Sequence, residues 1–232
     1  MAKRKLKRFE EMKKFSNVLQ PEFNEVYNKD FAFKGKWNKS FFQNDNPIIV
    51  DLGCGKGEYT IELARRFEEK NYIGIDIKGA RIWKGAKQAL DENIKNAAFI
   101  RTRVELINSF FDSNEIDEIW LLFPDPQPKK KKKRLTSGKF LNLYKKILRT
   151  DGIVHLKTDS DLLYLYTLEI AKYNNLKVEC FTDDLYNSNL IDDSLSIKTY
   201  YENQFLEQGS NINYLRFKLN NQSLIEESAE VT

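Results

Sequence analysis

The sequence predicts an α/β protein with a mostly parallel β-sheet and one antiparallel edge. From Pro47 onward, short β-rich runs alternate with helical stretches of roughly ten to fifteen residues, which is typical of βαβ units. The last two β-rich runs have no clear long helix of that kind between them, which favours antiparallel pairing there. We therefore expect seven strands in one sheet.

Each predicted element follows from its local pattern. The helix expected over residues 58–70 places Tyr59, Leu63 and Phe67 on one stripe. The predicted strands are 47–50, 72–75, 97–101, 118–123, 152–156, 177–181 and 213–219. The other predicted helices are 80–93, about 139–148, and 162–173.

Composition narrows the class of protein. The chain has 232 residues, of which 41% are hydrophobic and 13% aromatic, enough for one sizeable core. The apolar run 119–123 is far too short to span a membrane, and the charged start has no apolar signal-like stretch. Two cysteines, Cys54 and Cys180, provide neither a disulfide framework nor a structural zinc site. We expect a cytoplasmic enzyme with no membrane association and no metal.

Charge is unevenly distributed along the chain. The net charge is only +4, but basic residues crowd the first fourteen positions and run without a break over 129–134. The last residues are polar and acidic. We expect a mobile basic arm over 1–30, one domain over 31–220 and a polar acidic tail over 221–232.

Four aspartates fall at the ends of predicted strands: Asp51, Asp76, Asp125 and Asp159. The carboxyl ends of parallel strands lie on one side of a sheet, where open α/β folds bind ligands. The alternative is that aspartate is simply common in turns and at helix N-caps, and Asp159 fits that alternative well. Taken together, the four acids favour a ligand site.

A glycine-rich loop follows the first predicted strand. Gly53, Gly55 and Gly57 let the backbone turn tightly and approach a ligand closely. Their G-x-G-x-G spacing differs from the dinucleotide fingerprint, since Glu58 stands where its last glycine would be. Asp76 lies 19 residues after Gly57, where an acid can accept hydrogen bonds from ribose hydroxyls.

The negative charge of these four aspartates, which form an acidic rim at the strand ends, discriminates among possible ligands. NAD carries an anionic pyrophosphate, whereas S-adenosylmethionine (SAM) is a net cation and suits several carboxylates. A magnesium site is a third alternative, but it would not explain the function of the glycine loop. We therefore expect SAM as the cofactor.

A proline-rich and basic loop, residues 123–130, is the most specific feature of the sequence. Its prolines stiffen the chain directly after a strand, with Asp125 at the rim and a lysine run beside it. Such a run is often only a solvated surface loop or a localisation-like patch. Next to a candidate active site, it favours a polyanionic substrate whose binding weakens in salt.

The chain resembles the bacterial tRNA (guanine-N7)-methyltransferases from about Ile49 to Leu219. The motifs that carry the resemblance occur in order at 51–57, 74–76, 123–126, 157–159, 187–190 and 199–202. The resemblance implies a Rossmann-like class I methyltransferase fold. It also implies methyl transfer from SAM to N7 of a variable-loop guanosine of tRNA, position 46.

The resemblance also assigns roles to single residues. It implies SAM contacts for Asp51, Gly53, Gly55, Gly57, Asp76, Arg103 and Asp125. It implies tRNA or guanine contacts for Lys129, Asp159, Thr199, Tyr200, Tyr201 and Glu202. Thr199 and Glu202 also have the spacing of a helix capping box, a purely structural alternative.

Some positions depart from the family pattern. Asp51 and Asp76 stand where many members have glutamate, and Gln127 replaces a usual tryptophan. Arg103 stands where an acid is common; since arginine cannot accept a hydrogen bond, adenine recognition there is expected to use the backbone or Glu105. Tyr200 replaces a common basic residue.

Methyl transfer to guanine N7 requires the protein to position the base rather than to remove a proton. Guanine N7 keeps a free lone pair, so no general base is expected, and Asp125 and Asp159 are expected to position the base. Two alternatives are a non-catalytic RNA-binding protein with this fold and an NAD-dependent oxidoreductase. The expected partner is tRNA, and the protein is expected to be a monomer or a homodimer.

Overall fold

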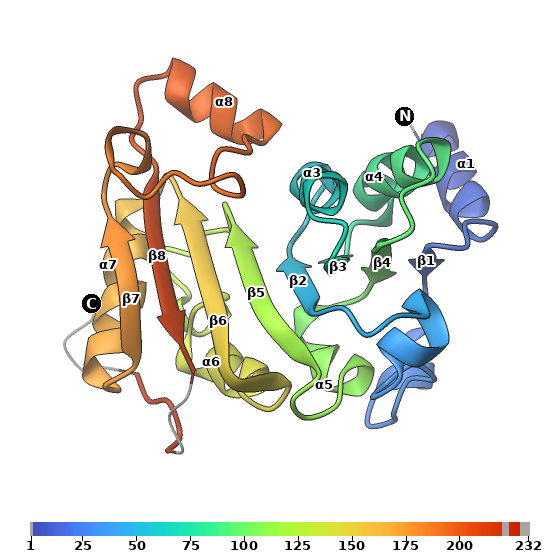
Figure 1. Ribbon diagram of the computed structural model, residues 1–232, viewed down its shortest axis with the longest axis horizontal. Coiled ribbons are helices and arrows are strands. Elements are labelled where there is room, and N and C mark those ends of the chain that lie inside the picture. The colour runs from blue at the N-terminus through green and yellow to red at the C-terminus, as the bar shows by residue number, and fades with distance from the viewer. Residues whose placement is uncertain (1, 220–222, 228–232) are drawn as a thin grey trace. The chain divides into compact units, whose positions relative to one another are not determined.

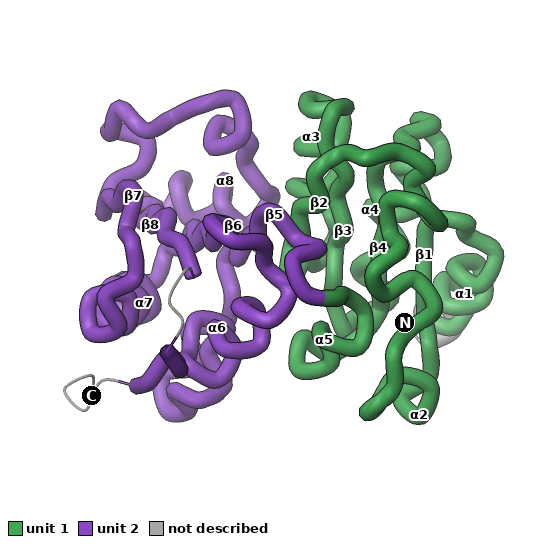
Figure 2. The backbone as a smooth tube through the Cα atoms, turned by 60° about the horizontal axis from the view of Figure 1, so that its bottom comes forward, with its two compact units in different colours: residues 1–112 green, residues 113–232 purple. Residues whose placement is uncertain are grey.

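The computed structural model describes residues 2–219 and 223–227, with side chains from residue 6 onward. The chain forms two compact units, residues 1–112 and 113–232, coloured green and purple in Figure 2. Each unit contains four of the eight described strands and has helices of its own. The predicted division at residues 30 and 220 stays a prediction.

The first unit has a parallel sheet with strand order β1-β4-β3-β2. Its strands are β1 (Val18–Leu19), β2 (Ile48–Leu52), β3 (Asn71–Asp76) and β4 (Ala97–Arg101). Its helices are α1 (Ala2–Met12), α2 (Phe23–Val26), η1 (Trp37–Phe42), α3 (Glu58–Arg66), α4 (Gly79–Asp91), η2 (Val104–Leu106) and α5 (Ile107–Phe110). Helices α3 and α4 pack against β3 and β4, and against each other (Figure 1).

Helix α1 lies within the segment predicted to be a mobile arm, and it docks on α4. The guanidinium of Arg8 lies 4.6 Å from the ring centre of Trp83, whose Nε1 donates a hydrogen bond to Glu11 at 2.7 Å. Phe9 packs so close to the start of α4 that a Cβ at Gly79 would lie 2.6 Å from its ring. An amphipathic helix with aromatic anchors therefore holds this part of the arm.

An aromatic cluster that the sequence pattern did not predict fills the base of the first unit. Trp37 is fully buried, and its Nε1 donates to the carbonyl of Phe110 at 2.8 Å. Rings that pack around it come from Phe33, Phe41 and Phe111. Because these aromatics are irregularly spaced in sequence, no helical or strand period reveals them.

The second unit has the strand order β5-β6-β8-β7. Its strands are β5 (Ile116–Leu122), β6 (Leu148–Thr158), β7 (Lys177–Thr182) and β8 (Asn213–Lys218). Its helices are η3 (Lys131–Lys133), α6 (Gly138–Tyr144), α7 (Asp161–Tyr173), η4 (Leu185–Asn187) and α8 (Tyr200–Glu207). β5 and β6 are parallel, while β8 is antiparallel to both β6 and β7, which confirms the predicted antiparallel edge.

Helix α7 packs against strands β6 and β8 of this unit and lies behind the strands in Figure 1. Residues 223–227 contact the helices of this unit. The side chain of Glu227 accepts hydrogen bonds from Gly138 N at 2.9 Å and from the Tyr166 hydroxyl at 2.6 Å. This part of the predicted tail is therefore attached to α6 and α7, while Glu230 lies outside the described residues.

All seven predicted strands are found, and the short β1 is an addition to them. β6 begins at Leu148, four residues earlier than expected. It passes through Asp151, whose φ is +67°. Within the described residues, no helix is long and apolar enough to cross a membrane.

Candidate functional site

The glycine loop joins β2 to α3 with three residues in the left-handed region. Gly53, Gly55 and Gly57 have φ of +82°, +57° and +70°, which glycine adopts at little cost. A Cβ at Gly57 would lie 2.6 Å from Cε1 of Phe99, so only glycine fits there. A Cβ at Gly55 would meet nothing closer than a carbonyl at 3.9 Å, so the space over this residue is open.

Asp76, the last residue of β3, is tied to this loop. Its Oδ2 accepts a hydrogen bond from Gly55 N at 3.0 Å, and its Oδ1 accepts one from Lys78 N at 2.7 Å. Each carboxylate oxygen can accept a second hydrogen bond. The two backbone donors thus fix the orientation of a half-buried carboxylate that can still receive a ligand.

Asp51 lies within β2, since the strand runs through Leu52 rather than ending at residue 50 as expected. Its side chain is buried, and its Oδ2 accepts from the Thr60 hydroxyl at 2.7 Å. Its Oδ1 is buried and has no hydrogen-bond partner among the described residues. Burial, reinforced by the charge of Asp76 and opposed by the Thr60 hydrogen bond, raises the pKa of Asp51 to about 7.

Arg103, the remaining first-unit residue of the predicted cofactor set, is exposed. It lies two residues after the end of β4 and forms the N-cap of the short η2 helix. Glu105, the neighbouring acid considered for adenine recognition, lies within η2 and is also exposed. A role for Arg103 in cofactor binding stays a prediction.

Asp125 lies in the second unit, in the loop after β5. It is exposed, and its Oδ1 accepts a hydrogen bond from Gln127 N at 3.0 Å. Phe123 and Gln127 have positive φ, +48° and +44°, which is uncommon for side chains with a Cβ. Phe123 N donates to the carbonyl of Lys157 at 2.8 Å, so the start of the loop is held against β6.

The basic run after this loop divides into surface and buried cations. Lys129, Lys130, Lys132 and Lys133 are exposed. Arg134, the last cation of the run, is only 1% exposed, so the alternative of a solvated surface loop does not hold for this residue. Its Nε donates to the Pro126 carbonyl at 3.0 Å, and its guanidinium lies 4.2 Å from the ring centre of Tyr166. Arg134 therefore anchors the loop, because an aromatic face and a carbonyl replace the water it loses.

Asp159 directly follows β6 and lines a cleft of about 570 Å³ in the second unit. Asp161 and Tyr164 of α7 and Asn213 of β8 line the same cleft. Burial raises the pKa of Asp159, and the charge of Asp161 raises it further. Asp159 is thus a half-buried carboxylate facing a space large enough for a small ligand.

Residues 199–202 start helix α8 as a capping box. The Thr199 hydroxyl accepts from Glu202 N at 3.2 Å, and Glu202 Oε2 accepts from Thr199 N at 3.2 Å. Glu202 is fully buried, whereas Tyr200 and Tyr201 are 52% and 46% exposed. The predicted contact segment therefore presents its tyrosines, rather than Glu202, at the surface.

Glu202 also pairs with Lys157 of β6, a partner that the sequence did not suggest. Lys157 Nζ lies 2.6 Å from Glu202 Oε1 and donates to the carbonyls of Leu195 at 3.1 Å and Ile197 at 3.0 Å. The Tyr186 hydroxyl donates to Glu202 Oε1 at 2.5 Å. The predicted strand ends at residue 156, so the sequence did not place this lysine inside the sheet, where a buried cation requires a partner.

Comparison with known proteins decides the family. A family model described as "Putative methyltransferase" matches residues 45–215. A tRNA (guanine-N(7)-)-methyltransferase of Bacteroides thetaiotaomicron is 50% identical over 227 residues, covering 98% of this chain and 90% of that protein. One of Christiangramia forsetii is 52% identical over 221 residues, covering 94% and 99%. The chain belongs to the tRNA (guanine-N7)-methyltransferase family. The resemblance predicted from the motifs is therefore confirmed.

Solved structures agree on the fold of this tRNA (guanine-N7)-methyltransferase family member. An antibiotic-related methyltransferase matches with a TM-score of 0.60 and 15% identity, covering 82% of this chain and 95% of that chain. The 16S rRNA methyltransferase KamB matches with a TM-score of 0.59 and 12% identity, covering 82% and 94%. The class I methyltransferase fold predicted from the sequence is confirmed.

The residues predicted from the family motifs fall into two groups. In the first unit, the structure brings together Asp51, Asp76 and the three loop glycines. In the second unit, Asp159 lines the cleft, while Thr199 and Glu202 cap α8. Sequence reasoning missed Thr60, which holds one oxygen of Asp51, and Asn213, which no motif marks.

Proposed function

We propose that this protein transfers a methyl group from SAM to N7 of a guanine in tRNA. The observation that carries the proposal is Oδ1 of Asp51, a buried acceptor beside the open glycine loop that has no hydrogen-bond partner in the described part of the chain. Relatives at 50% and 52% identity over nearly the whole chain carry this activity in their names. The proposal thus has support from local chemistry and from family membership.

The first unit has the chemistry that SAM requires. A buried acceptor on Asp51 and a fixed carboxylate on Asp76 suit a ligand that brings positive charge and hydrogen-bond donors. We assign Asp51 and Asp76 to the donor groups of SAM, and the backbone of the glycine loop to its close approach. Arg103 and Asp125 complete the set that the resemblance implies. When bound, SAM supplies an electrophilic methyl group.

The acceptor side of the reaction falls to acids of the second unit. Guanine N7 attacks with its own lone pair, so these acids have to hold the base rather than remove a proton. We assign Asp159 to the N1–H donor of guanine, and either Asp125 or Asp159 to the positive charge that develops on the ring. His155 has no catalytic task, because it is buried and stacked 3.9 Å from Trp120.

Binding of tRNA uses charge and stacking. Exposed lysines of the run 129–133, Lys129 among them, are assigned to phosphates, which they hold without reading sequence. Tyr200 and Tyr201 offer exposed rings to unstacked bases, and the Thr199 hydroxyl can donate a hydrogen bond. Because the target base lies within folded RNA, it has to leave its stack to be methylated.

The deciding experiment incubates the protein with radiolabelled SAM and an unmodified tRNA transcript, and then maps the methylated nucleotide. The expected product is a single N7-methylguanosine in the variable loop. A transcript with adenosine at that position is the control and should remain unlabelled. Absence of label on the guanosine transcript, despite measurable SAM binding, would favour a non-catalytic RNA-binding role.

A further inference from the structure

The cleft beside Asp159 is lined by a residue with a buried polar atom that has no hydrogen-bond partner among the described residues. Asn213, the first residue of β8, is fully buried and pairs in register with Thr158 of β6. Its Nδ2 donates to Oδ1 of Asp161 at 2.9 Å, while its Oδ1 is buried with no hydrogen-bond partner among the described residues. Buried carbonyl oxygens are rarely left in this state, because the missing hydrogen bond destabilises the folded protein.

The orientation of this amide follows from its neighbour. An ionised Asp161 carboxylate can only accept hydrogen bonds, so the NH₂ group of Asn213 must face it. The carbonyl oxygen of Asn213 is then the atom left over. It is an acceptor held in one position by the strand on one side and by Asp161 on the other.

The remaining lining of the cleft defines the ligand it can take. Three carboxylates line it, from Asp159, Asp161 and Asp183, and no lysine, arginine or histidine is among its lining residues. A phosphate would be repelled there, whereas a group rich in hydrogen-bond donors would be bound. At about 570 Å³, the cleft has the size of pockets that hold small molecules.

We propose that this cleft receives the Watson–Crick edge of the target guanine and that Asn213 is a further specificity-determining residue. Guanine presents two neighbouring donors on that edge, N1–H and the 2-amino group, whereas adenine has an acceptor at N1. Asp159 accepts from N1–H, and Asn213 Oδ1 accepts from the 2-amino group. This inference rests on the proposed function, since it names how the same site selects its base.

The test compares two tRNA substrates that differ by one group. One carries guanosine at the methylated position, and the other carries inosine, which keeps N7 and N1–H but lacks the 2-amino group. We expect the wild-type protein to prefer guanosine by about tenfold in kcat/KM, the usual effect of one well-placed hydrogen bond. Asn213→Ala should reduce this preference to about threefold or less, mainly by slowing methylation of guanosine.

Two further variants test the acceptor oxygen. Asp161→Ala frees the amide that Asp161 orients, so it should reduce the guanosine-to-inosine ratio as Asn213→Ala does. Asn211→Ala changes an exposed asparagine of the same cleft and should retain the wild-type ratio. Asn213→Val suits a strand and has no hydrogen-bond acceptor on its side chain, so it replaces Asn213→Ala if the alanine variant does not fold.

The outcomes separate this inference from the proposed function. If the wild-type protein methylates the guanosine tRNA but Asn213→Ala and Asn213→Val keep its full preference over inosine, the role of Asn213 is rejected. The same holds if the wild-type protein does not distinguish the two substrates. If it methylates neither substrate while binding SAM, the proposed function itself fails.

Discussion

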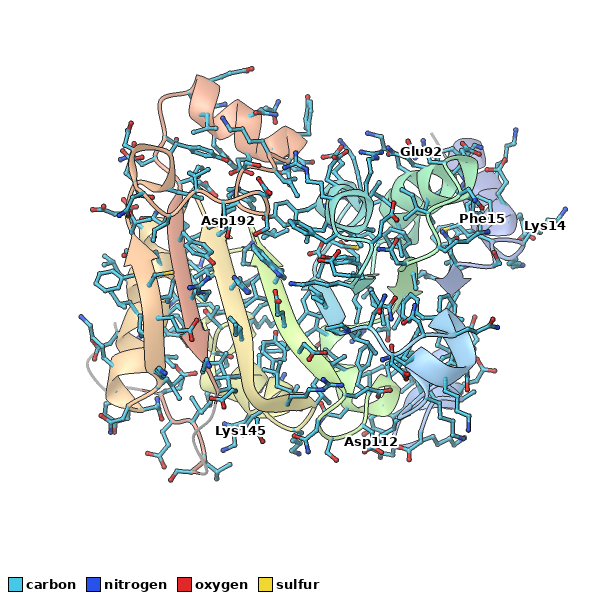
Figure 3. All side chains as sticks on the ribbon, viewed as in Figure 1. Lys14, Phe15, Glu92, Asp112, Lys145 and Asp192 are labelled. Carbon is cyan, nitrogen blue, oxygen red and sulfur yellow. The ribbon has the colours of Figure 1, made fainter. Side chains whose placement is uncertain are left out.

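Lys157 Nζ lies 2.6 Å from Oε1 of Glu202, and neither side chain is exposed to solvent. The pair joins β6, which leads to Asp159, to the first turn of α8, which begins with the exposed Tyr200 and Tyr201. Lys157 also holds the carbonyls of Leu195 and Ile197, in the segment marked by Asp192 in Figure 3. Burial lowers the pKa of Lys157, and the Glu202 charge opposes this shift. The pair therefore fixes the elements that carry the predicted guanine and tRNA contacts.

Breaking this pair on one side should be costly. Lys157→Met leaves Glu202 charged and buried without its partner, which should lower the free energy of unfolding by about 3–5 kcal/mol. Urea denaturation measures this loss. The double variant Lys157→Met/Glu202→Leu should regain much of the lost stability. Its KM for tRNA should stay above the wild-type value, because the backbone carbonyls of Leu195 and Ile197 still lack the hydrogen bonds from Lys157. Equal stability of the single variant and the wild type would contradict the prediction.

Asp76→Ala should weaken SAM binding roughly 10- to 100-fold, because it removes a charge-assisted acceptor and frees the glycine loop at Gly55. Isothermal titration calorimetry measures the affinity. The matched control is Asp91→Ala, which removes an exposed ion pair with Lys87 at the other end of α4. That control should bind SAM as the wild type does, and an unchanged affinity in Asp76→Ala would exclude this site.

Affinity for SAM should depend on pH through Asp51. Since its pKa lies at about 7, the carboxylate is largely protonated at pH 6 and ionised at pH 8. A cationic ligand prefers the ionised form, so the dissociation constant of SAM should fall about tenfold from pH 6 to pH 8. In Asp51→Asn, the dependence should disappear; a steep dependence in that variant would assign it to another group.

The same group has the opposite effect on the stability of the ligand-free protein. The pKa of Asp51 rises from 3.8 to about 7 on folding, so the folded state keeps a proton that the unfolded state has released. Stability should therefore fall as the pH rises from about 4 to about 7, and this contribution should be absent in Asp51→Asn. Thermal melting of both proteins over this pH range measures the difference.

The exposed lysines of the run should set the salt dependence of tRNA binding. Changing Lys129, Lys130, Lys132 and Lys133 to alanine should reduce the slope of log affinity against log salt by about three, since each phosphate contact contributes slightly less than one. Filter binding at several salt concentrations measures the slope. Arg134→Ala should instead lower the melting temperature, because its guanidinium is buried on Tyr166. An unchanged slope in the fourfold variant would place the phosphates elsewhere.

Asp159→Ala should lower turnover while SAM still binds, because its carboxylate lines the second-unit cleft and is assigned to guanine rather than to SAM. Single-turnover kinetics with saturating SAM measure the methylation rate, and calorimetry measures SAM affinity. Retained turnover would reject the role of Asp159 in holding guanine.

Much of the fold and of the cofactor side could be predicted because the signals are local. Alternating strands and helices, the glycine spacing and the position of Asp76 at a strand end are all short-range patterns. The helix cap at Thr199 and Glu202 was also visible as a four-residue motif, and it is present. The docking of α1 on α4 was not predicted, because it depends on which distant surface accepts Phe9 and Arg8.

The sequence by itself determined the order of strands and helices, the family and the residue types available for chemistry. Only the tertiary structure decided which polar atoms are left without a partner and which charges are removed from water. Among residues 2–219 and 223–227, Oδ1 of Asp51 and Oδ1 of Asn213 have no hydrogen-bond partner, whereas Glu202 is neutralised by Lys157 and Arg134 is covered by Tyr166. The physical reason is that periodicity is a property of neighbours along the chain, while desolvation and hydrogen-bond pairing depend on segments that meet only on folding.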